Sequence, residues 1–333
     1  MFACPRRFSS RNTAARTLTG RWMTEKFSRF MASPVAEHVA KLLQLLLLCG
    51  LCLYLLHELS LIGWKDLWEN VPTTPAYYCI LLTSFLLLPC SELLIYRPLW
   101  PDLHSKGAAI LAVLLRKQAL NDVIIGYSGE AFFLLWAKQN IGVTMKAAFN
   151  VVKDNNLISA AVSAAAALII VVFFMFSGQL GLLTHHAPGT LPTIVGPATL
   201  GLLLVPFLAF FGHHIITLPK PQILRIATLH GARIVVFESL LVIQWSIVIP
   251  DIPLGVWVGF IAARMVLTRI PLLPNKELIL LGLAVTLSEY LPNAAAALGA
   301  LFLTSSAITQ VLNTVVLLVT GVRDFSRKRA EVC

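Results

Sequence analysis

Long apolar runs separated by short polar stretches dominate this chain of 333 residues. A helix needs roughly 20 apolar residues to cross the hydrocarbon core of a bilayer. The alternation of apolar and polar residues that is typical of membrane barrels is absent, so the runs predict helices. The expected fold is an all-α integral membrane protein, a polytopic bundle of about seven spans plus short re-entrant half-helices. The predicted spans are Lys41–Ile62, Thr74–Ile95, Leu157–Ser177, Ile194–Thr217, Thr228–Ile249, Leu254–Leu272 and Ala294–Gly321.

One apolar stretch, Ser105–Gln139, is interrupted by charged and amide residues and by the turn Gly126–Gly129. As one continuous span it would place several charges at depth, at about 2.5–3.5 kcal/mol each near a helix centre. We therefore predict two half-length helices that enter from the cytoplasmic side and meet at the turn. Ser128 is the expected N-cap of the second, and Glu130 suits its first turn. An amphipathic helix pair lying on the membrane surface is the alternative.

A second short segment begins in a similar way. Leu273-Pro274-Asn275-Lys276-Glu277 supplies a turn, a candidate N-cap at Asn275 and a first-turn carboxylate at Glu277. The helix that follows, Glu277–Leu291, would be only about 22 Å long at 1.5 Å per residue. Paired interrupted segments in the two halves of a membrane protein point to a binding site at mid-depth.

Composition and charge agree with a membrane location. The chain is 57% hydrophobic and 13% charged, whereas a soluble domain averages about a quarter charged residues. Its net charge is +10, yet of its 26 Lys and Arg residues only Lys65 falls in a loop predicted to be outside. This bias predicts that both termini are cytoplasmic. Because these charges are explained by topology near anionic lipid, we expect no nucleic-acid partner.

Three regions are expected along the chain. Residues 1–38 are basic and rich in Arg, Ser and Thr, and they predict a disordered cytoplasmic arm. A transit peptide, or a true start at Met23 or Met31, stays open as an alternative. Residues 39–322 form the transmembrane helical domain, and residues 323–333 form a basic cytoplasmic tail.

Several ionisable residues fall inside predicted spans, where they are functional candidates by default. Arg264 could meet Glu238 from the neighbouring span, and a purely structural ion pair is the alternative. In the functional interpretation, Arg116, Arg233 and Arg264 supply forked donors for a lipid phosphate. The intramembrane candidates are Glu92, Arg233, Glu238, Arg264 and Glu289.

The two first-turn glutamates have more than one possible role. The helix dipole alone could explain Glu130 and Glu277. Alternatively, they could hold a cationic headgroup, or pair with an arginine and keep the cavity neutral when it is empty. Helix N-termini at Gly129 and Lys276 would add backbone N–H donors for an anion.

No pattern in the chain indicates a metal, a cofactor or a catalytic residue. The pairs His185-His186 and His213-His214 each offer one good ligand, because adjacent helical side chains point about 100° apart. HExxH, GxSxG, Walker A and dinucleotide-binding patterns do not occur. We expect no metal, no cofactor and no catalytic site.

Two groups of residues carry a resemblance to a known family. Arg116-Lys117, Asn121, Gly126-Tyr127-Ser128-Gly129-Glu130 and Trp136-Ala137-Lys138 form the first, and Arg269-Ile270-Pro271 with Pro274-Asn275-Lys276-Glu277 forms the second. Over about Lys41–Gly321 the chain resembles the flippase-like transmembrane domain of lysylphosphatidylglycerol synthetases. It departs from that family in its Gly-Tyr-Ser-Gly turn, in Lys138 where an Arg is expected, and in lacking the aminoacyl-transferase domain. The resemblance implies a stand-alone bundle with two re-entrant hairpins that binds or translocates lipids, without lysyl transfer.

The leading hypothesis is a flippase-like protein of a bacterial inner membrane that handles an anionic phospholipid or a lipid-linked substrate. An organellar source, a membrane-embedded enzyme acting on a lipid or isoprenoid phosphate, and a non-catalytic assembly protein are the alternatives. The oligomeric state stays open. The expected substrate-binding residues are Arg116, Asn121, Ser128, Gly129, Glu130, Arg233, Glu238, Arg264, Asn275 and Glu277.

Overall fold

The computed structural model describes residues 63–100, 103, 107–123, 127–176, 216–267 and 295–332, with isolated positions at 53, 56, 60 and 282. Within these ranges the protein consists of helices and short connections, and they contain no strand. Three helical segments are long and apolar enough to cross a membrane: Pro75–Leu99, Lys220–Val248 and Ala296–Gly321. These findings confirm an all-helical fold in the described part and the character of a membrane protein.

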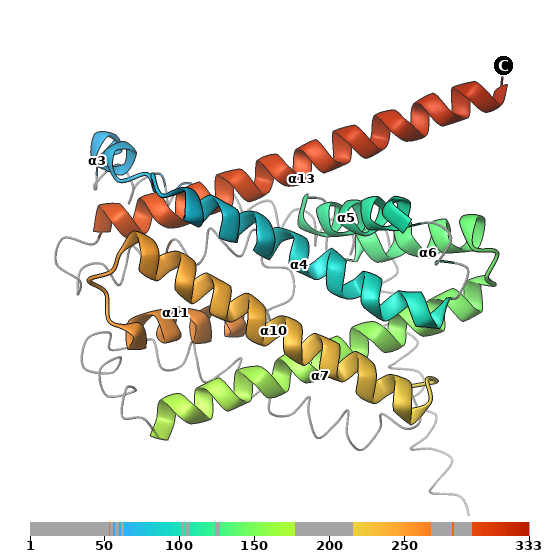
Figure 1. Cartoon of the computed structure of the whole chain (residues 1–333), viewed down its shortest axis with the longest axis horizontal. Coiled ribbons are helices and arrows are strands. Elements are labelled where there is room, and N and C mark those ends of the chain that lie inside the picture. The colour runs from blue at the N-terminus through green and yellow to red at the C-terminus, as the bar shows by residue number, and fades with distance from the viewer. Residues whose placement is uncertain are drawn as a thin grey trace, which may run out of the picture. The chain divides into compact units, whose positions relative to one another are not determined.

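Three predicted spans correspond to these helices. They are α4 (Pro75–Leu99), α10 (Lys220–Val248) and the apolar part of α13 (Ala295–Val332) (Figure 1). α7 (Met145–Phe176) covers the span predicted from residue 157 but begins a dozen residues earlier, with polar turns. α11 (Leu254–Leu267) has 14 residues, about 21 Å, which is shorter than the hydrocarbon core.

The count of about seven spans is therefore not confirmed. The predicted span Lys41–Ile62, nearly all of Ile194–Thr217, and the short segment Glu277–Leu291 lie outside the described residues, apart from isolated positions. The first loop predicted to be outside contains a short helix, α3 (Trp64–Glu69). Its tryptophans Trp64 and Trp68 are exposed, as expected for residues at a membrane interface.

The stretch predicted to hold two short helices does hold them. α5 (Gly107–Val123) and α6 (Ser128–Asn140) are separate helices that pack against each other. Their entry into a membrane stays a prediction. The expected cap was wrong: the N-cap of α6 is Tyr127, in the left-handed conformation with φ 73°, and no side chain caps the helix.

α4 and α10 pack side by side and antiparallel. Near the start of α4, Gln244 of α10 donates a hydrogen bond to the Tyr77 carbonyl (3.2 Å). Near its end, Ile95 packs in one apolar cluster with Ile226. α7 packs against α6, α10 and α11, while α5 contacts α4, α6 and α13. This arrangement brings α4, α5, α6, α7 and α10 around a shared interior.

Aromatic side chains fill two parts of that interior. Tyr96, Trp100 and Phe133 lie with ring centroids 4.8–5.7 Å apart. Trp245 packs against Phe302 at 5.3 Å and forms a second cluster with α11 and α13. Both spacings are in the range of favourable aromatic contacts.

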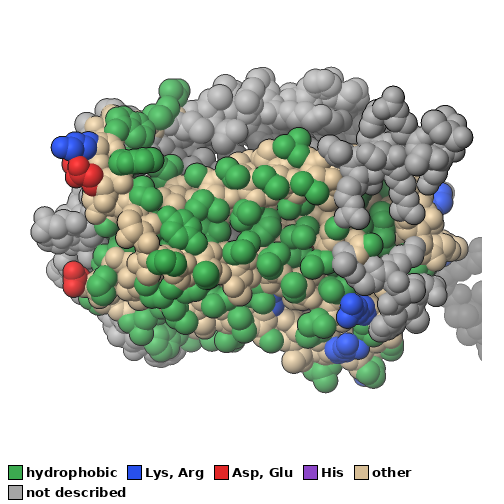
Figure 2. Space-filling view, turned by 45° about the horizontal axis from the view of Figure 1, so that its top comes forward, with side chains coloured by type: hydrophobic (Ala, Val, Ile, Leu, Met, Phe, Trp, Pro, Cys, Tyr) green, Lys and Arg blue, Asp and Glu red, His purple; other side chains and the backbone are tan. Residues whose placement is uncertain are grey.

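The outer surface is apolar over much of one face. Figure 2 shows hydrophobic side chains spread across the middle of that face, with the visible charged side chains near its ends. The exposed apolar residues come from most of the long helices, among them Leu82, Phe173, Leu224, Ile243 and Val315. A continuous apolar exterior of this kind suits a lipid environment and would be a liability in water.

Basic residues gather at one end of the α4–α10 pair. Arg97 lies in the last turn of α4, and Lys220 begins α10. Because the two helices are antiparallel, these cations share an end. Asp154 of α7 joins the same end, where its Oδ2 accepts hydrogen bonds from the Thr217 and Leu218 backbone at 2.7 and 3.0 Å. The basic end is the one that the sequence assigns to the cytoplasm.

Candidate functional site: a buried ionic network

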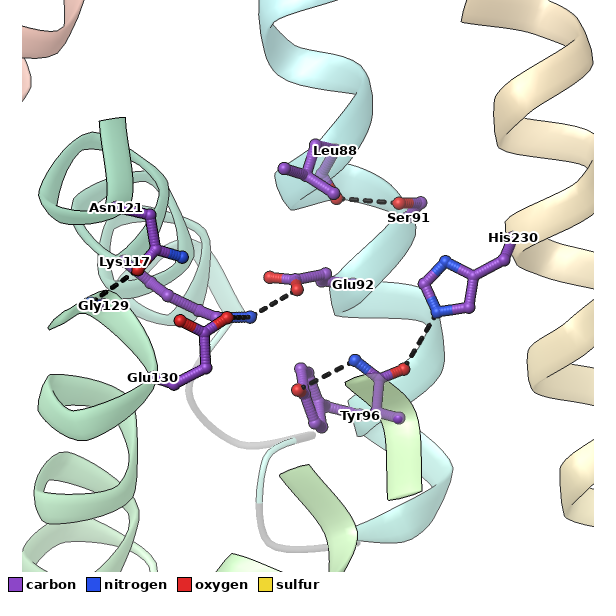
Figure 3. Close-up of polar contacts among 10 residues, drawn as sticks. Leu88, Ser91, Glu92, Tyr96, Lys117, Asn121, Gly129, Glu130 and His230 are labelled. Carbon is purple, nitrogen blue, oxygen red and sulfur yellow. Dashed lines mark hydrogen bonds and ion pairs between the residues drawn. The ribbon is translucent and has the colours of Figure 1, made fainter. Parts of the chain in front are cut away.

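A buried lysine forms the centre of the site. Lys117 of α5 is 2% exposed, and its Nζ pairs with Glu92 of α4 and with Glu130 Oε1 of α6, the latter at 3.4 Å (Figure 3). The same Nζ lies 5.8 Å from the ring centroid of Tyr96 and 5.7 Å from that of Phe133. One cation thus binds two carboxylates from two other helices, and aromatic rings exclude water around it.

The start of α6 is held tightly against α5. The Gly129 N–H donates to Asn121 Oδ1 at 2.7 Å, and the Ser128 hydroxyl donates to a backbone carbonyl of α5 at 2.7 Å. A Cβ at Gly129 would lie 2.0 Å from the Lys117 carbonyl oxygen, so only glycine permits this approach. The close approach places Glu130 beside Lys117.

Four of the expected site residues therefore do come together, and their contact with a substrate stays a prediction. Asn121, Ser128 and Gly129 form a frame between two helices, and Glu130 completes an ion pair. The sequence analysis missed Lys117, the residue around which they gather. A lysine that interrupts an apolar run is the feature that could have identified this position. The predicted site contains its neighbour Arg116 instead. Arg116 lies with its Cζ 4.7 Å from the ring centroid of Phe132.

A chain of polar side chains continues from this cluster toward α10. The Asn155 amide of α7 donates to the Tyr96 hydroxyl at 3.1 Å. Its Oδ1 lies 3.0 Å from His230 Nε2 of α10, which donates to it in the matching tautomer. Tyr96, Asn155 and His230 are all buried. They link three helices that are distant in the sequence, and none of the three was expected in the site.

The predicted pair of Arg264 and Glu238 is confirmed. Arg264 Nη2 of α11 lies 3.4 Å from Glu238 Oε1 of α10, and its guanidinium covers the Phe237 ring at 4.6 Å. Arg233 lies within electrostatic range of Glu92, Glu238 and Arg264. Its charge is therefore influenced both by this pair and by Glu92 of the cluster around Lys117. Asn275 and Glu277 lie outside the described residues.

The network is balanced in charge. Counted in their ionised forms, this group has three carboxylates and three cations. Arg233 lies about 20 Å along α10 from the first residue of that helix. The six groups are Glu92, Glu130 and Glu238 with Lys117, Arg233 and Arg264.

The chemical groups of this site are cationic donors and carboxylates. Ammonium and guanidinium groups in dry surroundings are strong donors to phosphate or carboxylate oxygens. In the described part of the chain, no group of three His, Cys, Asp or Glu side chains is arranged to hold a metal ion.

Comparisons with other proteins yield no relative. No protein family, no curated protein and no solved structure matches this chain. The resemblance to the flippase-like domain of lysylphosphatidylglycerol synthetases therefore stays a prediction.

Proposed function

We propose that this membrane protein binds an anionic phospholipid or a lipid-linked substrate and moves it between leaflets, in the manner implied by its resemblance to the flippase-like domain. The observation that supports this proposal is the charge-balanced network buried among apolar helices. In the same proposal, the basic end faces the cytoplasm of a bacterial inner membrane and both termini are cytoplasmic.

The energetic argument concerns why such a network is kept. Buried ion pairs contribute little net stability. Replacing them with apolar residues of similar volume often leaves the free energy of unfolding unchanged or raises it by about 1–4 kcal/mol. Ionisable residues within a membrane are rare and mostly serve a substrate or ion pathway. A network of six charges therefore favours a binding role over a packing role.

The proposed binding step is an exchange of partners. A lipid phosphate takes the place of Glu130 at Lys117, while Glu92 stays bound. Glu130 is the carboxylate best placed to leave, because its side chain is 15% exposed and that of Glu92 is 8% exposed. Its Oε2 is also buried without a hydrogen-bond partner among the described residues. Arg233 and Arg264 then offer the next donors along the path.

Translocation of a fluorescent phosphatidylglycerol in proteoliposomes, followed by quenching from outside, tests the proposal. Lys117→Gln should slow transfer at least tenfold, since it removes the central charge. Glu130→Gln should retain more bound phosphatidylglycerol and slow its release, since the competing carboxylate is gone. The matched control is Lys138→Gln, an exposed position on α6, which should behave as wild type. Absence of transfer by the wild-type protein, with no lipid selectivity in any variant, would refute lipid handling.

A second candidate, a non-catalytic assembly protein, is favoured by one observation. Lys117 and Arg264 already have carboxylate partners, and the hollow found between α4 and α10 is not lined by any of the six charges. In this case the network only locks helices together. If the network only locks helices together, replacing Lys117 and both of its carboxylates with methionine preserves function. If the network binds lipid, the same replacement abolishes lipid exchange.

A further inference from the structure

A shallow hollow lies between α4 and α10, at the basic end of the bundle. It has about 350 Å³ of free space, including the part open to the surroundings. Its wall is apolar, and its base belongs to the cluster of Ile95 and Ile226. The residues that line it are Ile95, Pro98 and Leu99 of α4 with Gln222, Arg225, Ile226 and Leu229 of α10.

One cation lies at the edge of this apolar surface, and two more belong to the same end of the α4–α10 pair. Arg225 lies at its edge and is exposed; its one hydrogen bond to a described residue is a long one, 3.5 Å from Nη2 to the Leu94 carbonyl. Arginine carries five N–H donors, so most of the donors of Arg225 are not used by the Leu94 carbonyl. Lys220 is exposed at the start of α10, and Arg97 lies in the last turn of α4. No carboxylate is among the described residues that line the hollow.

We infer that this hollow is a binding site for one anionic phospholipid of the surrounding bilayer. Part of one acyl chain lies against Ile95, Leu99 and Leu229, and the phosphate accepts hydrogen bonds from Arg225. The charge pattern selects the occupant: an exposed arginine beside an apolar wall, at the basic end of the bundle, fits an anionic headgroup at the interface. Because the bundle exposes apolar surface to lipid on both sides of the hollow, the occupant can enter sideways from the leaflet. The site is separate from the ionic network and does not require translocation.

Native mass spectrometry of the full chain, released from nanodiscs of phosphatidylglycerol and phosphatidylcholine, tests the inference. Arg225→Gln should retain about fivefold less phosphatidylglycerol, the loss expected for one cation near a membrane surface. Leu229→Trp should lower retention similarly by filling the hollow. The matched controls are Lys138→Gln, another exposed cation, and Leu224→Trp, on the same helix but 70% exposed. All substituted positions are exposed or half-buried, so we expect every variant to fold. Elution as a single species in size-exclusion chromatography verifies this.

The outcomes separate this site from the proposed function. A loss in Arg225→Gln and Leu229→Trp alone supports the inference, whether or not the protein translocates lipid. Equal retention in all variants overturns it, and so does an equal loss in the controls. A loss in Arg225→Gln but not in Leu229→Trp would also overturn it, because the headgroup would then be held without the hollow.

Discussion

Replacing Lys117 with methionine separates the cost of breaking the buried network from the cost of removing it. The side chain is 2% exposed and forms ion pairs with two carboxylates. Removing one partner of a buried ion pair typically costs 3–5 kcal/mol, since a charge is left uncompensated. Glu130 is 15% exposed and can regain some water, so we expect a loss near the lower end, about 3 kcal/mol.

The triple replacement of Glu92, Lys117 and Glu130 by methionine should behave differently. It removes the three charges of this cluster and keeps similar volumes, so we expect it to regain at least about 1 kcal/mol over the single variant, while the charge of Arg233, left without Glu92, keeps it below wild type. Reversible unfolding in mixed micelles by titration with dodecyl sulfate, followed by tryptophan fluorescence, measures both changes. Lys138→Met, at an exposed position of α6, should change the free energy of unfolding by no more than about 0.5 kcal/mol. A single variant that loses under about 1 kcal/mol, or a triple variant no better than the single, would refute the assignment of Lys117 as a buried, charge-paired residue.

Three further predictions test the packing around the network. Gly129→Ala should destabilise the protein severely or block folding, because the new Cβ would overlap a backbone carbonyl of α5. Gly321→Ala, which has open space around it, should be neutral or stabilising by up to about 1 kcal/mol. Thermal melting in detergent compares the two variants. A double-mutant cycle on Arg264 and Glu238, each changed to Gln, should give a coupling free energy of about 0.5–3 kcal/mol, and a value near zero would mean that the pair is hydrated. Tyr77→Phe should cost about 1–3 kcal/mol, because it removes a hydroxyl that bonds two groups of α13 at 2.9 and 2.6 Å; unchanged unfolding would contradict that contact.

The parts of the fold that could be predicted are those encoded locally. The apolar length of α4, α10 and α13 is enough to identify them. The break between α5 and α6 was also predictable, because glycines and charges interrupt the run there. The pair of Arg264 and Glu238 was accessible for a similar reason: α10 and α11 are joined by a short turn, so their facing residues are close in sequence as well as in space.

The central contacts could not be predicted, although Lys117 and Glu92 are no farther apart in the sequence than Arg264 and Glu238, at 25 and 26 residues. Lys117 meets Glu92, and His230 meets Asn155 from 75 residues away. Which side chains meet depends on the rotation of each helix about its axis, and packing sets that rotation rather than periodicity. Composition marks a lysine in an apolar run as unusual but does not identify its partner.

The wrong cap at α6 has a similar cause. A serine before a helix normally accepts a hydrogen bond from the backbone of the first turn. Here the Gly129 N–H is bound by Asn121, and the Ser128 hydroxyl donates to α5. Contacts between helices replaced the local cap, and Tyr127 took the left-handed position outside the helix. The sequence pattern correctly indicated that a helix begins here, but it placed the N-cap at Ser128, one residue after the observed N-cap at Tyr127.

The positions of the hollow and of the network on shared helices bear on the proposed function. Ile95 lines the hollow, and the next residue, Tyr96, belongs to the polar chain; Leu229 and His230 repeat this relation on α10. Adjacent helical side chains point about 100° apart, so each helix presents an apolar surface outward and a polar surface inward at the same depth. An amphipathic substrate needs both surfaces, whereas a purely structural network needs only the inner one. If lipid retained at the hollow also rises in Glu130→Gln, the two surfaces serve one path; if it does not, the hollow is an independent lipid site.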